Sequence, residues 1–268
     1  MGWQLICLVV TGLAAGMLGG LLGIGGSSVM LPAMVWILGR ADNAGHEQIN
    51  QYMAAAMIVN FLLILPSVVA HLHNRAVWKG VWAYLAPAGA AGIILGAWAS
   101  YQVEGLYLRW GVGAFLLYVA GHNLYSMAAA RRVEGLPRER VEGMPAWRKI
   151  LVGFPMGIIA GLLGIGGGSL AVPGQQIVLR MPLRNAIANS AATIASISWL
   201  GAIVKNARLH PPDGTVARSL LLAACLAPTA MIGSYLGGHL THKLPLRIIR
   251  AVFVAVLALS AAKMFGWL

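Results

Sequence analysis

Two glycine-rich segments contain the residues best suited to chemistry in this sequence. Both end in serine, and their members are Gly25, Gly26, Ser27 and Ser28 in the first and Gly166, Gly167, Gly168 and Ser169 in the second. Consecutive glycines permit an unwound backbone, and a helix that restarts there presents free N–H groups and a positive dipole end. Such a terminus binds an anion without a charged side chain. We therefore predict that these residues bind a small anion.

The alternative is that the glycines only let two helices approach closely. Gly12, Gly16 and Gly20 have the four-residue spacing that is typical of such packing. The contiguous glycines favour a broken helix instead, because packing needs glycine on one face and three in a row cover every face. Each glycine also costs about 1 kcal/mol inside a helix. Neither segment has the lysine and spacing of a P-loop.

Polar residues inside other apolar runs are candidates for lining the same path. Asn60 lies in the second run, and Asn189 and Thr193 share one helix face in the sixth because they are four residues apart. Gln175, just beyond the second glycine-rich segment, could donate to an anion's oxygen. The alternative is interhelical hydrogen bonding, worth about 0.6 kcal/mol on average. Lys205 ends the sixth run, where we expect it to snorkel towards the interface rather than attract anions.

Several kinds of chemistry are excluded by what the apolar runs lack. All seven acidic residues fall outside these runs, which excludes a proton relay or a metal cage built on buried carboxylates. The two cysteines, Cys7 and Cys225, have no CxxC spacing. No cofactor motif and no nucleophile–base pair is visible. We therefore expect no enzymatic activity, no metal and no cofactor.

The composition defines the class of protein that holds these residues. Of 268 residues, 59% are hydrophobic and 10% are charged, with a mean hydropathy of +0.77, whereas soluble domains carry about 25% charged residues. The formal net charge of +12 would suggest nucleic-acid binding. However, the basic residues stand in short gaps between apolar runs, which is typical of a multi-pass inner-membrane protein. We therefore predict an all-α integral membrane protein and no nucleic-acid partner.

The apolar runs predict about eight transmembrane helices, since a bilayer needs about 20 apolar residues per helix. Their bounds are Leu5–Gly39, Gln48–Ala70, Gly80–Val103, Trp110–Ala130, Ile150–Leu179, Asn185–Val204, Ser219–Leu240 and Leu246–Leu268. The first would extend about 51 Å as one helix at about 1.5 Å per residue, against a hydrocarbon core of about 30 Å. The first and fifth runs must therefore tilt, break or re-enter, and we place a break at each glycine-rich segment.

The chain also repeats itself. Gly20 to Pro32 matches Gly161 to Pro173 at an offset of 141 residues. We predict an N-terminal four-helix repeat over 1–130, a basic cytoplasmic linker over 131–149 and a C-terminal four-helix repeat over 150–268. If every run crosses once, the two halves are parallel, and the positive-inside rule places the N-terminus on the cytoplasmic side with the linker.

These features resemble the sulfite exporter TauE/SafE family, also called the toluene sulfonate uptake permease family. The resemblance rests on the glycine-rich segment and its following proline, repeated once in each half, and it extends over essentially the whole chain. The segment from Gly164 to Ser169 is the closer copy, whereas the first copy has Ser27 and Ser28 where a third glycine is usual. The resemblance implies transport of sulfite, sulfonates and related small anions across the cytoplasmic membrane.

We therefore expect a transporter of small sulfur-containing anions that works by alternating access between the two repeats. Its partners are the lipid bilayer and the small anionic substrate, and association as a homodimer is left open. An anion channel of the same architecture and a membrane structural subunit without a solute path are the alternatives.

Overall fold

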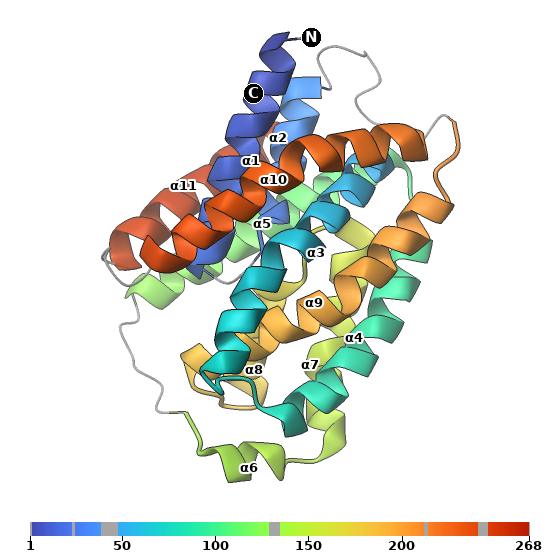
Figure 1. The fold of residues 1–268 in the computed structure, drawn as a ribbon. Coiled ribbons are helices and arrows are strands. Elements are labelled where there is room, and N and C mark those ends of the chain that lie inside the picture. The colour runs from blue at the N-terminus through green and yellow to red at the C-terminus, as the bar shows by residue number, and fades with distance from the viewer. Residues whose placement is uncertain are drawn as a thin grey trace.

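The computed structural model is helical throughout its regular elements, and the residues it describes, 2–22, 25–38, 48–128, 135–211, 214–240 and 246–267, include no strand (Figure 1). The helices are α1 Gly2–Leu22, α2 Ser27–Leu38, α3 Ile49–His73, α4 Lys79–Ala99, α5 Gly105–Ala128, α6 Arg138–Glu142, α7 Ala146–Leu163, α8 Gly168–Val178, α9 Leu183–Ala207, α10 Val216–Leu240 and α11 Leu246–Phe265.

Six of the described helices, α1, α3, α4, α7, α9 and α10, are long and apolar enough to cross a membrane. The outer surface is correspondingly apolar, with large side chains such as Ile177, Val69 and Trp199 exposed rather than packed. Large apolar patches of this kind are rare on soluble monomers. The chain is therefore a multi-pass membrane protein, as its composition predicted.

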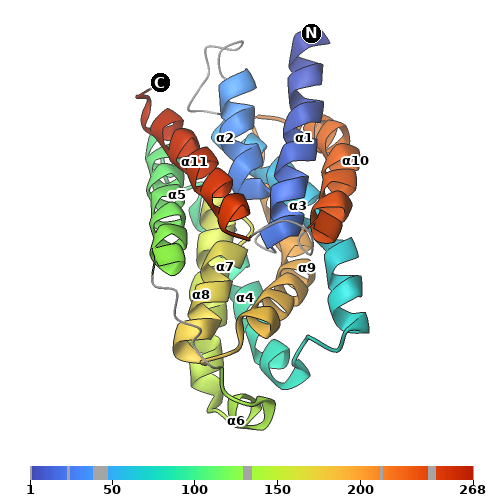
Figure 2. The ribbon, with the colours of Figure 1, turned by 90° about the vertical axis from the view of Figure 1, so that its left-hand side faces the viewer.

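Both glycine-rich segments interrupt a helix, as predicted, but the chain then turns back instead of continuing. A Cβ atom on Gly26 would lie 2.9 Å from the carbonyl oxygen of Ala15, so the start of α2 lies beside the interior of α1. In the second segment, Gly167 lies against Met156, and Gly174 lies against Val152. The helix pairs α1–α2 and α7–α8 are thus hairpins, and Figure 2 shows α2 beside α1 and α8 beside α7.

Left-handed backbone at the glycines makes these hairpins possible. Gly25 has φ +89°, Gly164 ends α7 with φ +66°, and Gly167 precedes α8 with φ +29°. Glycine adopts such angles at no steric cost because it has no Cβ atom. Of the alternatives stated for the first and fifth runs, the structure therefore favours a break with re-entry, and the condition of one crossing per run, from which parallel halves were derived, is not met by these two runs.

The first helix of each hairpin packs on a long helix from the other half of the chain. Three glycines of α1 contact α10: Gly12, Gly16 and Gly20. The residues that they contact on α10 also increase in number in this order, so α1 and α10 are parallel. In the same way α7 packs on α4, where Gly153 and Gly157 contact the backbone of α4. The glycines with four-residue spacing are therefore packing residues, because a Cβ atom at these positions would meet backbone atoms of the neighbour.

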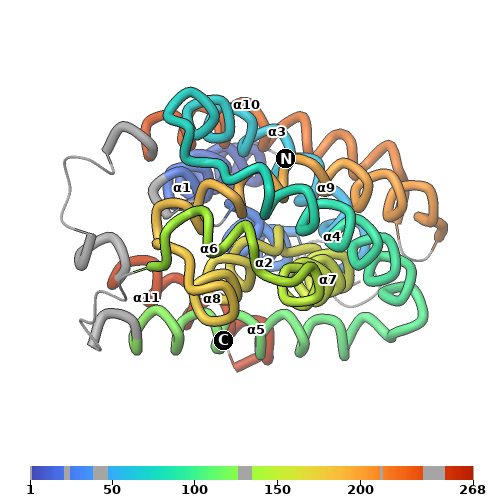
Figure 3. The backbone as a smooth tube through the Cα atoms, turned by 90° about the horizontal axis from the view of Figure 1, so that it is seen from below, coloured from blue at the N-terminus to red at the C-terminus, as the bar shows by residue number. Residues whose placement is uncertain are grey.

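The two long helices α3 and α9 cross the centre of the molecule in opposite directions. The amide nitrogen of Asn60 donates to Ser198 Oγ (3.4 Å) in the middle of both helices. Lys205, at the end of α9, donates to Asn50 Oδ1 (3.4 Å) at the start of α3. The helices α5 and α11 pack on one another and flank this centre, and Figure 3 shows α5 along one edge of the molecule.

Hydrogen bonds identify which helix ends share a side. The linker face is the side of α6, where Glu142 accepts from the backbone N–H of Gly80 at the start of α4 (3.1 Å). Asn185 at the start of α9 donates to Ala76 O on the same face (2.9 Å). The far face is opposite and holds the starts of α3 and α10, where Thr215 N donates to Gln51 Oε1 (2.9 Å). The described part of the predicted linker 131–149, from residue 135 on, contains α6 and the first turn of α7.

Candidate functional site

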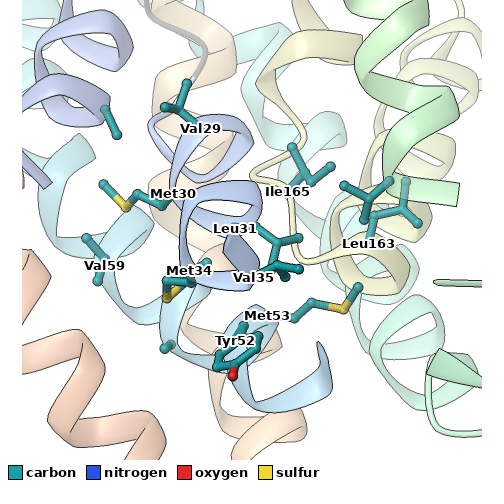
Figure 4. Packing of buried hydrophobic residues seen from close by; sticks show 14 of the residues in the cluster. Val29, Met30, Leu31, Met34, Val35, Tyr52, Met53, Val59, Leu163 and Ile165 are labelled. Atoms are coloured by element: carbon teal, nitrogen blue, oxygen red, sulfur yellow. The ribbon is translucent and has the colours of Figure 1, made fainter. Parts of the chain in front are cut away.

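The tips of the two hairpins meet in the centre of the molecule. The backbone N–H of Gly166 donates to Ser27 Oγ across the junction (2.7 Å). Apolar side chains seal the surroundings, and Figure 4 shows Leu31 and Val35 of α2 beside Leu163 and Ile165 of the second hairpin. Residues 25–30 and 163–169 are buried throughout.

Asn60 lies between the two tips. A Cβ atom on Gly25 would overlap its Oδ1 atom, and a Cβ atom on Gly166 would overlap its Nδ2 atom. Both glycines are therefore needed for the close approach of this side chain. Because Asn60 is near the midpoint of α3, which spans residues 49–73, the junction is near the middle of a membrane-crossing helix. Broken backbone at that depth is tolerated where protein or a cavity surrounds it.

Three buried polar atoms at this junction have no hydrogen-bond partner in the described part of the chain. They are Ser28 Oγ, Ser169 Oγ and Asn60 Oδ1. Ser28 and Asn60 are each 1% exposed, and Ser169 is 7% exposed. A buried hydroxyl without a partner costs about 1–3 kcal/mol, so native structures keep few such groups. The two serines are the second residues of α2 and α8, which makes them equivalent in the sequence match.

Two helix N-termini point into the same small region. The helices α2 and α8 have 12 and 11 residues and begin at Ser27 and Gly168. Each terminus carries the equivalent of about half a positive charge. The predicted donors of the second segment are partly engaged, however: the N–H groups of Gly167 and Gly168 donate to the carbonyls of Ile165 and Gly166. The hydroxyls of Ser28 and Ser169 are thus donors at the tips that no group in the described part of the chain engages.

The remaining predicted lining residues make hydrogen bonds within the protein. Asn189 accepts from Trp78 N (2.7 Å) and donates to Trp78 O (3.3 Å), so it holds the α3–α4 connection. Thr193 Oγ1 donates to Asn189 O (2.7 Å), and Gln175 Nε2 donates to Ser190 Oγ (2.7 Å). Asn189 therefore makes the contact between distant segments that was weighed as its alternative, whereas the hydrogen bond of Thr193 lies within α9. Gln175 keeps a buried Oε1 atom that has no hydrogen-bond partner within the described ranges.

The sequence prediction for Lys205 is wrong. Its side chain is fully buried (0% exposed) instead of extending to the interface. The ammonium donates to Ser100 Oγ (2.7 Å) and lies 3.5 Å from Met53 Sδ and 5.6 Å from the centre of the Tyr101 ring. The local sequence around a lysine at the end of an apolar run is the same whether its side chain extends to the membrane interface or is buried. Burial depends on helices from elsewhere in the chain.

Short hairpin helices that meet tip to tip near the midpoint of crossing helices are typical of secondary transporters. The family comparison agrees with that class: a model of the family described as sulfite exporter TauE/SafE matches residues 8–264. The chain therefore belongs to this family of membrane transporters. The family and its relatives are named as transporters and not as enzymes.

Relatives from several organisms are similar over nearly the whole chain. The probable membrane transporter protein MamO of Paramagnetospirillum magneticum is 27% identical over 97% of this chain, which spans only 44% of that relative's length. The probable membrane transporter protein YunE of Bacillus subtilis is 27% identical over 97% of this chain and 96% of its own length. A probable membrane transporter protein of Haemophilus influenzae is 26% identical over 97% of both chains. No solved structure matches the chain.

Proposed function

We propose that the protein transports small sulfur oxyanions, such as sulfite or sulfonates, and binds them between the tips of the two hairpins. The observation that supports this proposal is the pair of buried, unpartnered hydroxyls of Ser28 and Ser169 at two converging helix N-termini. Hydroxyls donate to the oxygens of an oxyanion, and such charge-assisted hydrogen bonds are about twice as strong as neutral ones. Asn60 shares the junction and positions both tips.

The site would hold negative charge with neutral groups. Two N-termini of about half a charge each offset one anionic group, and the substrate then needs no proton on its oxygens. The tips are buried, so a substrate held between them would have direct access to neither face. This burial supports alternating access, because each hairpin would have to separate from the helices that cover it before substrate could leave.

We propose two inverted repeats as the basis of that movement. They comprise 1–130 (α1 to α5) and 150–268 (α8 to α11 and most of α7), joined by the linker 131–149. Equivalent helices then make equivalent contacts: α1 packs on α10 as α7 packs on α4, and α3 runs antiparallel to its counterpart α9. Inverted repeats with a site at their interface provide two states of similar energy, one open to each side.

The charges orient these repeats in the inner membrane. Among the described residues, ten basic positions belong to the linker face, namely Arg75, Lys79, Arg138, Arg140, Arg148, Lys149, Arg180, Arg184, Arg247 and Arg250. Five described basic positions belong to the far face, namely Arg109, Lys205, Arg208, Arg218 and Lys263. The positive-inside rule therefore places the linker face in the cytoplasm. The start of α1 then lies on the opposite side, which reverses the orientation predicted for it from the sequence.

A ligand screen followed by transport assays tests this function. The purified protein is heated with sulfite, sulfate, thiosulfate, taurine or sulfoacetate, and a bound anion raises the unfolding temperature by mass action. Uptake of the stabilising anion into proteoliposomes is then measured against its concentration. We expect a saturable rate. A linear rate would support an anion channel instead, and no stabilisation and no uptake with any of these anions would contradict the proposed substrate class.

A further inference from the structure

A groove of about 480 Å³ lies on the outer surface between α4 and α9. It is lined by Ile94, Leu95 and Trp98 of α4 and by Val204 and Arg208 at the end of α9. The three side chains of α4 are 41–51% exposed. Because both helices are long and apolar enough to cross a membrane, we expect this open, largely apolar groove to face lipid.

Contacts between the two helices fix the walls of the groove. Both helices begin at the linker face and end at the far face, where Tyr101 Oη donates to Lys205 O (2.5 Å). Nearer the middle of the helices, Gly201 of α9 lies against Ile93 of α4. Figure 1 shows α4 beside α9. The groove is therefore present before any ligand binds, as is usual for ligand sites.

The lining residues follow the order of the groups in a phospholipid. Ile94 and Trp98 are four residues apart on α4, and Val204 and Arg208 are four apart at the end of α9, so each pair lies on one side of its helix. Trp98 and Arg208 are at the far-face end, where tryptophan is typical of the membrane interface. The apolar residues lie about 6 Å nearer the middle of the membrane. The groove thus has a cation at the membrane surface and apolar walls below it.

The Arg208 guanidinium is positioned at the end of the groove. It lies 5.8 Å from the centre of the Trp98 ring, a cation–π contact that holds it beside the groove. Among the residues that the structure describes, it has no carboxylate partner and no side-chain hydrogen bond. Its planar set of N–H donors matches a phosphate, which it can bind in bidentate fashion.

We propose that this groove binds an anionic phospholipid of the far-face leaflet, with an acyl chain between α4 and α9 and the phosphate on Arg208. The charge of the guanidinium favours an anionic headgroup, and basic pockets between membrane helices bind such headgroups. The bound lipid would join the ends of α4 and α9. It is distinct from the transported anion, so the inference does not depend on the proposed function.

The test measures lipid binding to the purified full-length protein by native mass spectrometry. The protein is titrated with phosphatidylglycerol or with phosphatidylcholine of the same acyl chains, and the affinity for the first bound lipid is compared. Wild-type protein should prefer phosphatidylglycerol by about fivefold, and Arg208→Gln should remove this preference. The matched control is Arg148→Gln at the linker face, where the guanidinium also lies beside an exposed tryptophan, Trp147 (5.4 Å). It should keep the preference.

Leu95→Trp provides a second variant, because it fills the groove and leaves the charge unchanged. It should also remove the preference, and it should unfold at the wild-type temperature since Leu95 is 51% exposed. A wild-type protein without the preference, a preference retained in either groove variant, or an equal loss in Arg148→Gln would overturn the site. So would soluble glycerol phosphate that binds as tightly as the lipid, or a lipid-free dimer that Arg208→Gln converts to monomers, since the groove would then hold a free phosphate or a second copy of the chain.

Discussion

Removing the hydroxyls of Ser28 and Ser169 should weaken substrate binding without lowering the stability of the protein. In most buried sites, Ser→Ala removes a hydrogen bond and destabilises the protein by about 1 kcal/mol. Here neither hydroxyl has a partner in the described chain, so each alanine removes an unsatisfied polar group that costs about 1–3 kcal/mol. We therefore expect each variant to unfold at the same temperature as the wild-type protein or above it.

The effect on substrate affinity should be opposite in sign. A hydrogen bond to a charged group contributes about 1.5–3 kcal/mol, which corresponds to a loss of affinity of about 10-fold to 150-fold for each serine. The assay is thermal unfolding in detergent, with and without the stabilising panel anion. The double variant should have an unchanged or raised unfolding temperature without anion and should lose the anion-dependent increase.

A matched control is Ser234→Ala, whose buried hydroxyl has a partner, since it donates to Leu63 O (3.0 Å). It should lower the unfolding temperature and retain the anion-dependent increase. The reasoning is refuted if Ser28→Ala and Ser169→Ala both unfold at lower temperature than Ser234→Ala and still respond to the anion. In that case the two hydroxyls are structural groups and the anion binds elsewhere.

Three further predictions concern packing, the α3–α4 connection and orientation. Gly16→Ala should destabilise the protein by about 1–3 kcal/mol or more, because its Cβ atom would meet the backbone of α10, whereas Gly121→Ala has open space and should be neutral or stabilising in thermal unfolding. Asn189→Ala should leave the buried backbone N–H of Trp78 without a partner and so lower the unfolding temperature, at a cost of about 1–3 kcal/mol. Anion affinity should stay unchanged. A loss of anion affinity without destabilisation would show instead that Asn189 lines the anion site. In a cysteine-free background, Glu139→Cys should react with an impermeant thiol reagent only from the cytoplasmic side and Pro211→Cys only from the opposite side, and the reverse pattern would invert the proposed orientation.

The sequence located the two helix interruptions because they depend on a local property. Gly25 and Gly167 adopt positive φ angles that other residues rarely adopt, so clustered glycines mark the break by themselves. The direction of the chain after the break was not predictable in this way. It depends on contacts such as Gly174 with Val152, and a hairpin and a crossing have the same length and hydropathy.

The candidate site was predictable in part for the same reason. Ser28 and Ser169 were identified by their place after the glycines, and both hydroxyls are buried without a hydrogen-bond partner among the residues that the structure describes. Asn189 has the side chain of a lining residue, but its partner is the backbone of Trp78, 111 residues away. Lys205 was misjudged because its burial requires Ser100 and Asn50 from two other helices. Periodicity along one segment carries no information about such distant partners.

Protection of cysteines at the hairpin tips tests the central claim most directly. In a background without Cys7 and Cys225, the variants Ser28→Cys, Ser169→Cys and Ser234→Cys are each treated with a small thiol reagent, with and without the stabilising panel anion. Binding between the tips predicts that the anion slows modification at both tip positions and leaves the rate at position 234 unchanged. Equal rates with and without the anion at both tip positions would contradict the account.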